Sequence, residues 1–358
     1  MQKTYPTLPG GWEIVEKLGS GSFGTVYRAR RSVGSYTEWA AVKHIPIPRS
    51  EDELSAIYDE LGSMDAGPVG QYLNEIKNSL VDEYQLLRTF SGHTNIVSCN
   101  DIQIMDRQDA LGYDIYIWME LLTCVSSCIL EGRMERAETT KLGIDICSAL
   151  IRLEKRNVVH RDVKPQNIFV NEDGDYKLGD FGAARRFRGI STVLSRKGTD
   201  AYAAPEIIRE QQGNCTADIY SLGLVLYRLM NNNLMPFMKQ GMESSVKERE
   251  LAILVRVSGE PLPPPVNADP ELARIILKAC AYKKEDRWQT AEEMRSALRR
   301  LRNGQPEKPV AIEPEGEKTE AQTPDSEQQP IEIQPSADEN RPQRKKGSIR
   351  LWLWGLCW

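Results

Sequence analysis

The sequence has few histidines and no cysteine arrangement that suggests a metal site or a disulfide framework. Its three histidines and seven scattered cysteines include no pair of CxxC motifs, so a zinc site is disfavoured and reduced thiols are expected. The net charge of −5 excludes the basic character of a nucleic-acid binder, so no nucleic-acid partner is expected. The first residues also lack the apolar segment of a signal peptide. We therefore expect a cytoplasmic protein.

The 358 residues carry the composition of a globular chain, with 40% apolar and 27% charged residues. After an N-terminal extension (1–11), an apolar pattern runs continuously over residues 12–302. Its early segments are strand-like, whereas later ones, such as 222–229 and 272–280, have helical periodicity. Strands followed by helices predict an α+β fold, with a small β-rich lobe and a larger α-rich lobe.

The C-terminal part has a different composition. Residues 304–348 hold seven prolines, ten acidic residues, six basic residues and no aromatic residue, which predicts a disordered linker over 303–348. The short apolar tail, 349–358, follows a basic cluster but is too short for the roughly twenty residues that span a bilayer. Weak association with the inner face of a membrane and a terminus without a role both stay open.

Two short motifs stand thirteen residues apart. The first is His160-Arg161-Asp162-Val163-Lys164-Pro165-Gln166-Asn167, and the second is Asp180-Phe181-Gly182. Together they resemble the catalytic and metal-binding loops of eukaryotic-type serine/threonine protein kinases, with details closer to the bacterial branch. The resemblance covers about residues 12–302. It implies the bilobal kinase fold, with an N-lobe (12–119), a hinge (120–124) and a C-lobe (125–302).

The resemblance also assigns roles to the two motifs. Asp162 would accept the proton of the substrate hydroxyl, and Lys164 would neutralise the moving phosphoryl group. Asn167 and Asp180 would hold Mg²⁺, which prefers oxygen ligands. His160 is expected to be a packing residue beneath Phe181, in a stack that Leu87 completes, and not a catalytic base.

The nucleotide end begins with a glycine-rich run, Gly19-Ser-Gly21-Ser-Phe-Gly24-Thr-Val26, between strand-like segments 13–18 and 25–29. Glycines let backbone N–H groups approach phosphates, and the strand that follows argues against a Rossmann helix. The resemblance makes Lys43, on the next strand, the lysine that holds the ATP phosphates. Its partner would be Glu83 on a helix, with Glu75 as the competing choice.

The resemblance also predicts an adenine pocket. Met119 would be the gatekeeper, and the backbones of Glu120 and Leu122 would bond adenine. The apolar walls would come from four side chains: Leu18, Val26, Ala41 and Phe169.

Residues 44–80 form an insertion that is longer than the family needs. Residues 50–62 are predicted as a helix with Ser50 as N-cap, and 62–70 as a loop. A regulatory insertion and a tolerated surface insertion remain alternatives.

The substrate end of the site is predicted from several further resemblances. Lys164 and the Gly198-Thr199-x-x-Tyr202 segment indicate serine/threonine specificity, with Thr199 in a substrate-positioning loop. Because Arg161 precedes Asp162, a loop phosphate is expected from autophosphorylation, in trans within a homodimer. An unregulated basic loop is the alternative. The candidate phosphosites are Ser191, Thr192 and Ser195. Two structural elements complete the set: a Glu206–Arg287 pair, and Asp218 as a brace beneath the catalytic loop.

We thus expect a non-specific serine/threonine protein kinase that uses ATP and Mg²⁺ on protein substrates. A pseudokinase scaffold is disfavoured because Lys43, Glu83, Asp162, Asn167 and Asp180 are all present. A small-molecule kinase is disfavoured by the Ala-Pro-Glu segment that ends at position 206, because this element serves peptide substrates.

Overall fold

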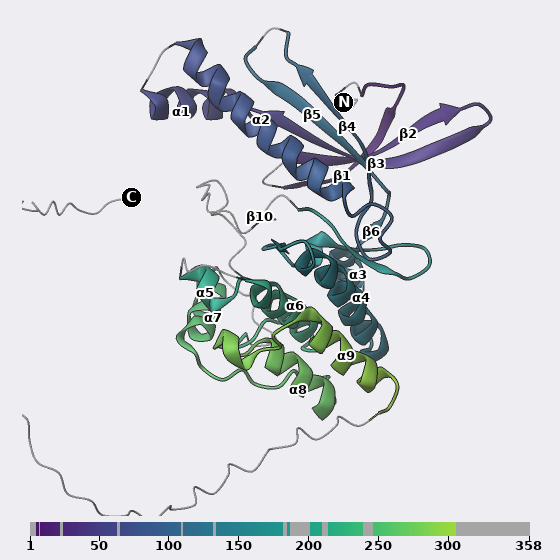
Figure 1. The fold of residues 1–358 in the computed structure, drawn as a ribbon, viewed down its shortest axis with the longest axis vertical. Coiled ribbons are helices and arrows are strands. Elements are labelled where there is room, and N and C mark those ends of the chain that lie inside the picture. The colour runs from purple at the N-terminus through teal and green to yellow at the C-terminus, as the bar shows by residue number, and fades with distance from the viewer. Residues whose placement is uncertain are drawn as a thin grey trace, which may run out of the picture. The chain divides into compact units, whose positions relative to one another are not determined.

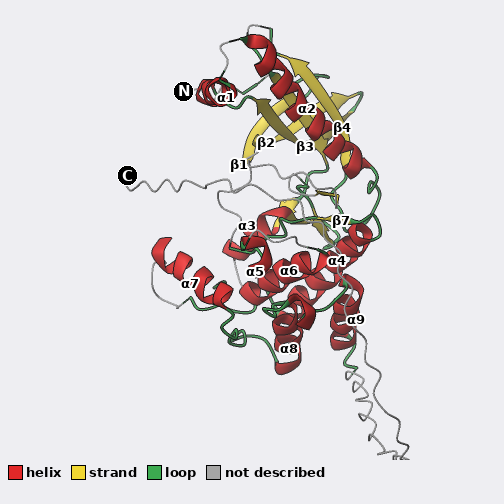
Figure 2. Cartoon of the chain, turned by 60° about the vertical axis from the view of Figure 1, so that its left-hand side comes forward, coloured by secondary structure: helices red, strands yellow, loops and turns green. Residues whose placement is uncertain are grey.

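The computed structural model describes residues 5–6, 8–21, 24–62, 65–108, 110–131, 134–181, 185–186, 201–209, 214–238 and 246–305. Within these residues the chain is bilobal. Strands gather in the N-terminal part and helices in the C-terminal part (Figures 1 and 2). The predicted α+β class and the order of strands before helices are therefore confirmed.

The N-terminal lobe is built on an antiparallel sheet with strand order β1-β2-β3-β5-β4. Its strands are β1 (Glu13–Gly21), β2 (Gly24–Val33), β3 (Tyr36–Ile47), β4 (Cys99–Asp106) and β5 (Tyr113–Met119). Because strand side chains alternate between faces, Tyr116 and Trp118 join one apolar cluster while Ile115 and Ile117 join the main core. The strands predicted at 13–18 and 25–29 are present and longer than expected.

Two helices pack beside this sheet, α1 (Glu51–Leu61) and α2 (Ala66–Arg88) (Figure 1). The side chain of Ser50 accepts a hydrogen bond from the Glu53 N–H (3.2 Å), so the predicted cap is confirmed. The loop predicted over 62–70 is wrong beyond residue 65. Asp65 caps α2, and Pro68 lies in its first turn, where the missing N–H costs nothing.

The C-terminal lobe contains most of the helices. They are α3 (Val125–Glu131), α4 (Arg136–Glu154), α5 (Pro205–Ile208), α6 (Cys215–Leu229), α7 (Val246–Ser258), α8 (Pro270–Ala279) and α9 (Ala291–Arg302), with 3₁₀ helices η1 (Pro165–Asn167) and η3 (Lys284–Asp286). The helical periodicities predicted near 222–229 and 272–280 correspond to α6 and α8. Helix α6 is almost wholly buried, and α4 packs against α6 and α9.

Short strands line the boundary between the two lobes. They are β6 (Thr123–Cys124), β7 (Val158–Val159), β8 (Ile168–Val170), β9 (Tyr176–Leu178) and β10 (Arg185–Arg186). Strands β6, β8 and β9 form one small sheet, and β10 pairs with β7. The hairpin β8–β9 joins the two predicted chemical motifs, so the fold fixes their separation.

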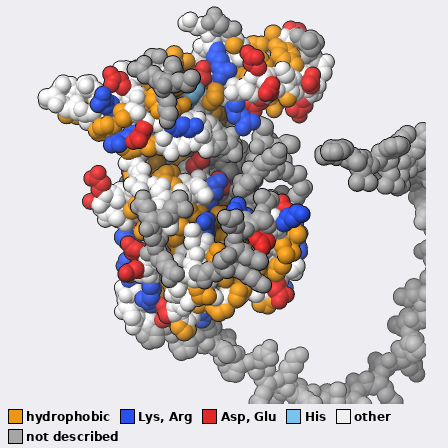
Figure 3. Space-filling view, turned by 180° about the vertical axis from the view of Figure 1, so that it is seen from behind, with side chains coloured by type: hydrophobic (Ala, Val, Ile, Leu, Met, Phe, Trp, Pro, Cys, Tyr) orange, Lys and Arg blue, Asp and Glu red, His pale blue; other side chains and the backbone are white. Residues whose placement is uncertain are grey.

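Three further observations concern the described residues taken together. The cysteines whose side chains the structure describes, Cys99, Cys124, Cys147, Cys215 and Cys280, are free thiols. In the part of the chain that is described, no helix has the length and apolarity needed to cross a membrane. Seen from behind, acidic and basic side chains are interspersed over the described surface (Figure 3). The predicted linker beyond residue 305 and the apolar tail lie outside the described residues.

Candidate active site

The segment that begins at His160 is fixed from below by a buried carboxylate. Asp218, in the first turn of α6, accepts hydrogen bonds from the backbone N–H groups of His160 (2.7 Å) and Arg161 (2.8 Å). Arg161 has a φ of 67°, a conformation that costs energy for a residue with a side chain. Burial outweighs these two hydrogen bonds and raises the pKa of Asp218 to about 7. The two bonds hold Arg161 in its strained conformation.

Asp162 is buried, and only one of its carboxylate oxygens is occupied. Its Oδ2 contacts Lys164 Nζ (2.7 Å) and accepts from Asn167 Nδ2 (2.8 Å). Asn167 Nδ2 also donates to the Asp162 carbonyl (2.8 Å), so both amide hydrogens serve to orient Asp162. Among the described residues, Asp162 Oδ1 has no hydrogen-bond partner although it is buried. A substrate hydroxyl is the kind of donor that would satisfy this oxygen.

The second carboxylate, Asp180, reaches the same region through the β8–β9 hairpin. Ile168 pairs with Leu178, and the Gly179 N–H donates to the Asn167 carbonyl (2.9 Å). The hairpin therefore places Asn167 and Asp180 on neighbouring segments at one edge. Asp180 itself has a φ of 55°.

Asn167 and Asp180 present oxygen atoms, the kind of ligand that suits a magnesium ion. The described residues include no group of three or more His, Cys, Asp or Glu side chains that could hold a metal. Because both amide hydrogens of Asn167 donate to Asp162, the amide oxygen is the atom that it can offer to a cation. Mg²⁺ is commonly bound by one or two protein oxygens together with substrate phosphates and water, and Asn167 with Asp180 could offer two such oxygens.

Lys43 connects the N-terminal sheet to this edge. It lies on β3 between Val26 on β2 and Ile117 on β5, and its Nζ contacts Asp180 Oδ1 at 2.6 Å. Burial alone would lower the pKa of Lys43, but the charges of Asp180 and then Glu83 raise it above its ordinary value. The ammonium group in turn holds the pKa of Asp180 below its usual range despite burial.

The predicted close pair between Lys43 and Glu83 is not formed in the structure. Glu83, on α2, is near enough to act on Lys43 through its charge, and it is the only one of the two candidate glutamates that does so. Burial raises the pKa of Glu83 from its ordinary 4.5 to about 7, with Lys43 opposing the rise and Asp180 adding to it. Glu83 is therefore partly protonated near neutral pH, and the fully ionised Asp180 is the stronger partner for Lys43.

An aromatic stack supports the turn that carries Asp180. The His160 ring meets the Phe181 ring edge-on, with centroids 4.7 Å apart, and His160 Nε2 lies 3.2 Å from the Gly179 carbonyl. Burial lowers the pKa of His160 to about 4, so its ring is neutral at physiological pH. Phe90, which the sequence interpretation missed, stacks on Phe181 at 6.2 Å. It lies three residues after the predicted Leu87, just past the end of α2, and both side chains are buried in the same core.

The glycine-rich run forms the ends of β1 and β2. Gly19 and Gly21 lie in β1, Gly24 begins β2, and positions 22 and 23 lie outside the described residues. Gly24 has a φ of 143°, and a Cβ atom there would lie 2.1 Å from the His44 carbonyl oxygen. Glycine at 24 is therefore required by the approach of β3, whereas a Cβ at Gly19 would meet nothing within 4 Å.

The predicted adenine-binding residues lie on adjoining strands. Val26 pairs with Lys43, and Ala41 pairs with Met119 at the end of β5. Phe169 on β8 lies on the other side of the boundary between the lobes, where it pairs with Cys124. Leu18 is the most exposed of the predicted apolar wall residues, with 48% of its surface accessible.

The first hinge residue has its side chain and its N–H already engaged. The Glu120 carboxylate accepts from the Ser98 N–H (2.7 Å) and pairs with Lys177 (2.9 Å). Its own N–H donates to the Ser98 carbonyl (3.2 Å), so the Glu120 carbonyl is the backbone group left for a base. Lys177 was not predicted, because nothing near it in sequence reveals a partner 57 residues away.

The predicted phosphosites Ser191, Thr192 and Ser195, and Thr199 of the substrate loop, lie outside the described residues. The segment that follows, from residue 201, is held by two arginines that the sequence interpretation missed. Arg256 of α7, almost fully buried, donates to the carbonyls of Ala201 (3.0 Å) and Ala203 (2.9 Å). Arg228 of α6 donates to the Tyr202 hydroxyl (2.6 Å).

A buried ion pair fixes the start of α5. The Glu206 carboxylate accepts from both terminal nitrogens of Arg287 at 2.7 and 2.8 Å, and the Arg287 side chain is wholly buried. Arg287 also donates to three backbone carbonyls, so its guanidinium is satisfied on every side.

A bilobal fold that brings a strand lysine, two carboxylates and an oriented amide to one edge defines a nucleotide-dependent phosphotransferase site. Residues 12–298, more than half of the chain, match the protein kinase domain, and the chain belongs to this family. The chain is 33% identical over 220 residues to serine/threonine-protein kinase 36 of Pongo abelii, which covers 61% of this chain and 14% of that protein. It is 30% identical over 216 residues to serine/threonine-protein kinase PknB of Mycobacterium tuberculosis, which covers 58% of this chain and 33% of that protein. Each match thus spans a third or less of the relative's length. The similarity to a bacterial kinase agrees with the predicted bacterial branch of the family.

Proposed function

We propose that this chain is a serine/threonine protein kinase that transfers the γ-phosphoryl group of Mg-ATP to serine or threonine hydroxyls of proteins. The observation that carries the proposal is the state of Asp162. One carboxylate oxygen is oriented by Lys164 and Asn167, and the other is buried without a partner among the described residues. A scaffold that only bound nucleotide would gain nothing from this arrangement.

In the proposed mechanism, Asp162 Oδ1 receives the hydrogen bond of the substrate hydroxyl and aims its oxygen for in-line attack. Lys164 lies close enough to Asp162 to neutralise charge on the transferred group as well. Asn167 and Asp180 are the proposed magnesium ligands, and bound Mg-ATP supplies the phosphoryl group. Lys43 is the proposed phosphate ligand. Its contact with Asp180 keeps both side chains charged before the nucleotide binds.

The other residues and segments of the site belong to the same proposal. The phosphates would be covered by Gly19, Gly21 and Gly24. Glu83 would form an ion pair with Lys43 once a metal ion binds Asp180. Residues 12–302 would form the catalytic domain, with the hinge at 120–124, followed by the linker (303–348) and the apolar tail (349–358). Partner chains would phosphorylate one another in the activation loop, at Ser191, Thr192 or Ser195.

The test is incubation of the purified chain with radiolabelled Mg-ATP and a general protein acceptor, beside an Asp162→Asn variant. Label on serine or threonine in the wild type, and its loss in the variant, is the expected result. Unlabelled protein in both samples, with ATP still bound, would contradict the proposal. Mass spectrometry then locates the sites. An active enzyme with Ser191, Thr192 and Ser195 unmodified would refute loop autophosphorylation alone.

A further inference from the structure

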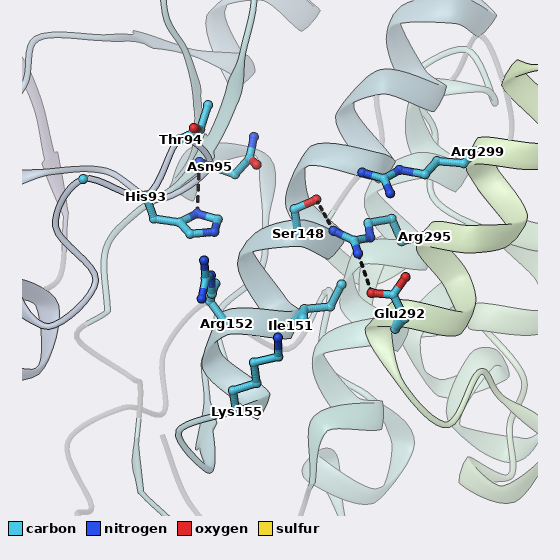
Figure 4. Close-up of a pocket in the computed structure, with 11 residues that line it drawn as sticks. His93, Thr94, Asn95, Ser148, Ile151, Arg152, Lys155, Glu292, Arg295 and Arg299 are labelled. Atoms are coloured by element: carbon cyan, nitrogen blue, oxygen red, sulfur yellow. Dashed lines mark hydrogen bonds and ion pairs between the residues drawn. The ribbon is translucent and has the colours of Figure 1, made fainter.

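A concave pocket of about 490 Å³ lies away from the proposed active site. Its walls come from the turn 92–95 that follows α2, from α4 and from α9 (Figure 4). None of the lining residues belongs to the nucleotide or catalytic groups described above. The volume falls within the range of about 300–1,000 Å³ that is typical of small-molecule sites.

The pocket is strongly cationic. Four basic side chains line it, Arg152 of α4, Lys155 just after the end of α4, and Arg295 and Arg299 of α9, together with a single carboxylate, Glu292. Figure 4 shows Arg152 on the side of His93, and Arg295 and Arg299 on the opposite side, with Ser148 between them. Two walls of positive charge therefore face a common hollow.

The one carboxylate is already engaged. Arg295 forms an ion pair with Glu292, and its Nη1 donates to Ser148 Oγ (3.1 Å). Arg295 Nε is buried without a partner in the described part of the chain. Arg152, Lys155 and Arg299 form no ion pair with any described residue, so no described carboxylate balances their charges. An anion in the pocket would supply the negative charge and the hydrogen-bond acceptors that these side chains lack.

His93 lies on the wall of the pocket as a neutral donor. The Asn95 N–H donates to His93 Nδ1 (3.3 Å), which leaves the hydrogen on Nε2. Burial lowers the pKa of His93, and the charges of Arg152 and Lys177 lower it further. Because nearby positive charges contribute to this lowered pKa beside burial, a bound anion would raise the pKa of His93.

We propose that this pocket binds a small molecule that carries phosphate. Guanidinium groups match phosphate oxygens in paired hydrogen bonds, and the Arg152 and Arg299 guanidinium groups have no competing carboxylate among the described residues. The volume exceeds that of a single phosphate ion, so the ligand has a second phosphate or an uncharged part. An apolar ligand would find little matching surface, because most of the lining side chains are polar or charged. The alternative is a solvated basic face with no ligand.

The chain contains only three histidines, which makes proton NMR of their ring resonances a direct test. The full chain is titrated with inorganic pyrophosphate without Mg²⁺, against sodium chloride at equal ionic strength. The His93 resonance is assigned with a His93→Gln variant. A saturable shift of His93 and a rise in its pKa are expected, while His160, beneath the proposed active site, stays unchanged. A linear shift that sodium chloride reproduces would overturn the proposal, as would no shift of His93.

An Arg152→Gln, Arg299→Gln double variant provides the second arm. Its affinity for pyrophosphate should fall by more than about tenfold, because two charged hydrogen-bond donors are removed. Arg302→Gln is the matched control, since it makes the same change on α9 outside the pocket lining and should bind like the wild type. Thermal unfolding verifies that each variant is folded. Equal affinity in the double variant and the wild type would refute the assignment.

Discussion

Loss of the Glu206 carboxylate should destabilise the domain strongly. In a Glu206→Gln variant, the Arg287 guanidinium stays wholly buried and charged but loses its counter-charge and its two-point acceptor. Its hydrogen bonds to the Ala281, Thr216 and Tyr282 carbonyls remain. Moving the arginine out of its site would therefore leave three backbone carbonyls without a donor. Breaking a buried pair from one side costs about 3–5 kcal/mol. Since single domains are stable by about 5–15 kcal/mol, this is a large share of the total.

Urea denaturation measures this change directly. The transition midpoint should fall while the slope with denaturant stays constant, because the folded structure is expected to remain the same. Glu285→Gln is the matched control, since Glu285 is exposed on η3 and should change the free energy of unfolding by less than about 0.5 kcal/mol. A combined Glu206→Leu, Arg287→Met variant should recover only part of the loss, because it leaves the three carbonyls unpaired. A cost below about 1 kcal/mol for Glu206→Gln would refute this account of the pair.

Three further predictions follow from single positions. Gly24→Ala should lower the free energy of unfolding by at least about 1–3 kcal/mol in urea, because its Cβ would collide with the His44 carbonyl, whereas Gly19→Ala should not. Between pH 4.5 and about 7 the folded state binds more protons at Glu83 than the unfolded chain does, so stability falls as pH rises through this window. Glu83→Gln should flatten that fall by up to about 3 kcal/mol, and an unchanged pH profile of urea midpoints would contradict the raised pKa. Asp218→Asn should lower kcat more than it raises KM for ATP, because an amide cannot accept hydrogen bonds from both backbone N–H groups, of His160 and Arg161, with two oxygens as the carboxylate does. If steady-state kinetics gave the variant the wild-type kcat, this bracing role would be excluded.

The sequence revealed what lies within short, contiguous stretches. The eight residues from His160 to Asn167 contain the proposed base, its lysine and one metal ligand, so their association needed no knowledge of tertiary structure. Strand and helix order, and the Ser50 cap, followed from periodicity and capping chemistry. The start of α2 was misjudged because Gly67 and Pro68 suggest a loop, although both are tolerated in a first helical turn.

Contacts between distant segments could not be deduced in this way. Lys43 and Asp180 are 137 residues apart. Whether Lys43 pairs with Asp180 or with Glu83 depends on the burial that raises the pKa of Glu83. The arginines that hold residues 201–203 were missed for the same reason, because Arg256 meets its acceptors only after α7 packs beside α5. Burial and long-range packing, which set these partners, are properties of the folded chain.

The central claim is that Asp162 acts in the transfer step and not in nucleotide binding. The most direct test measures Mg-ATP affinity and the single-turnover rate of phosphoryl transfer for the wild type and Asp162→Asn. We predict unchanged affinity and a transfer rate lower by about 10²–10⁴-fold, the usual contribution of a positioned general base. An Asp162→Asn variant that binds Mg-ATP equally well and transfers phosphate at the wild-type rate would contradict it.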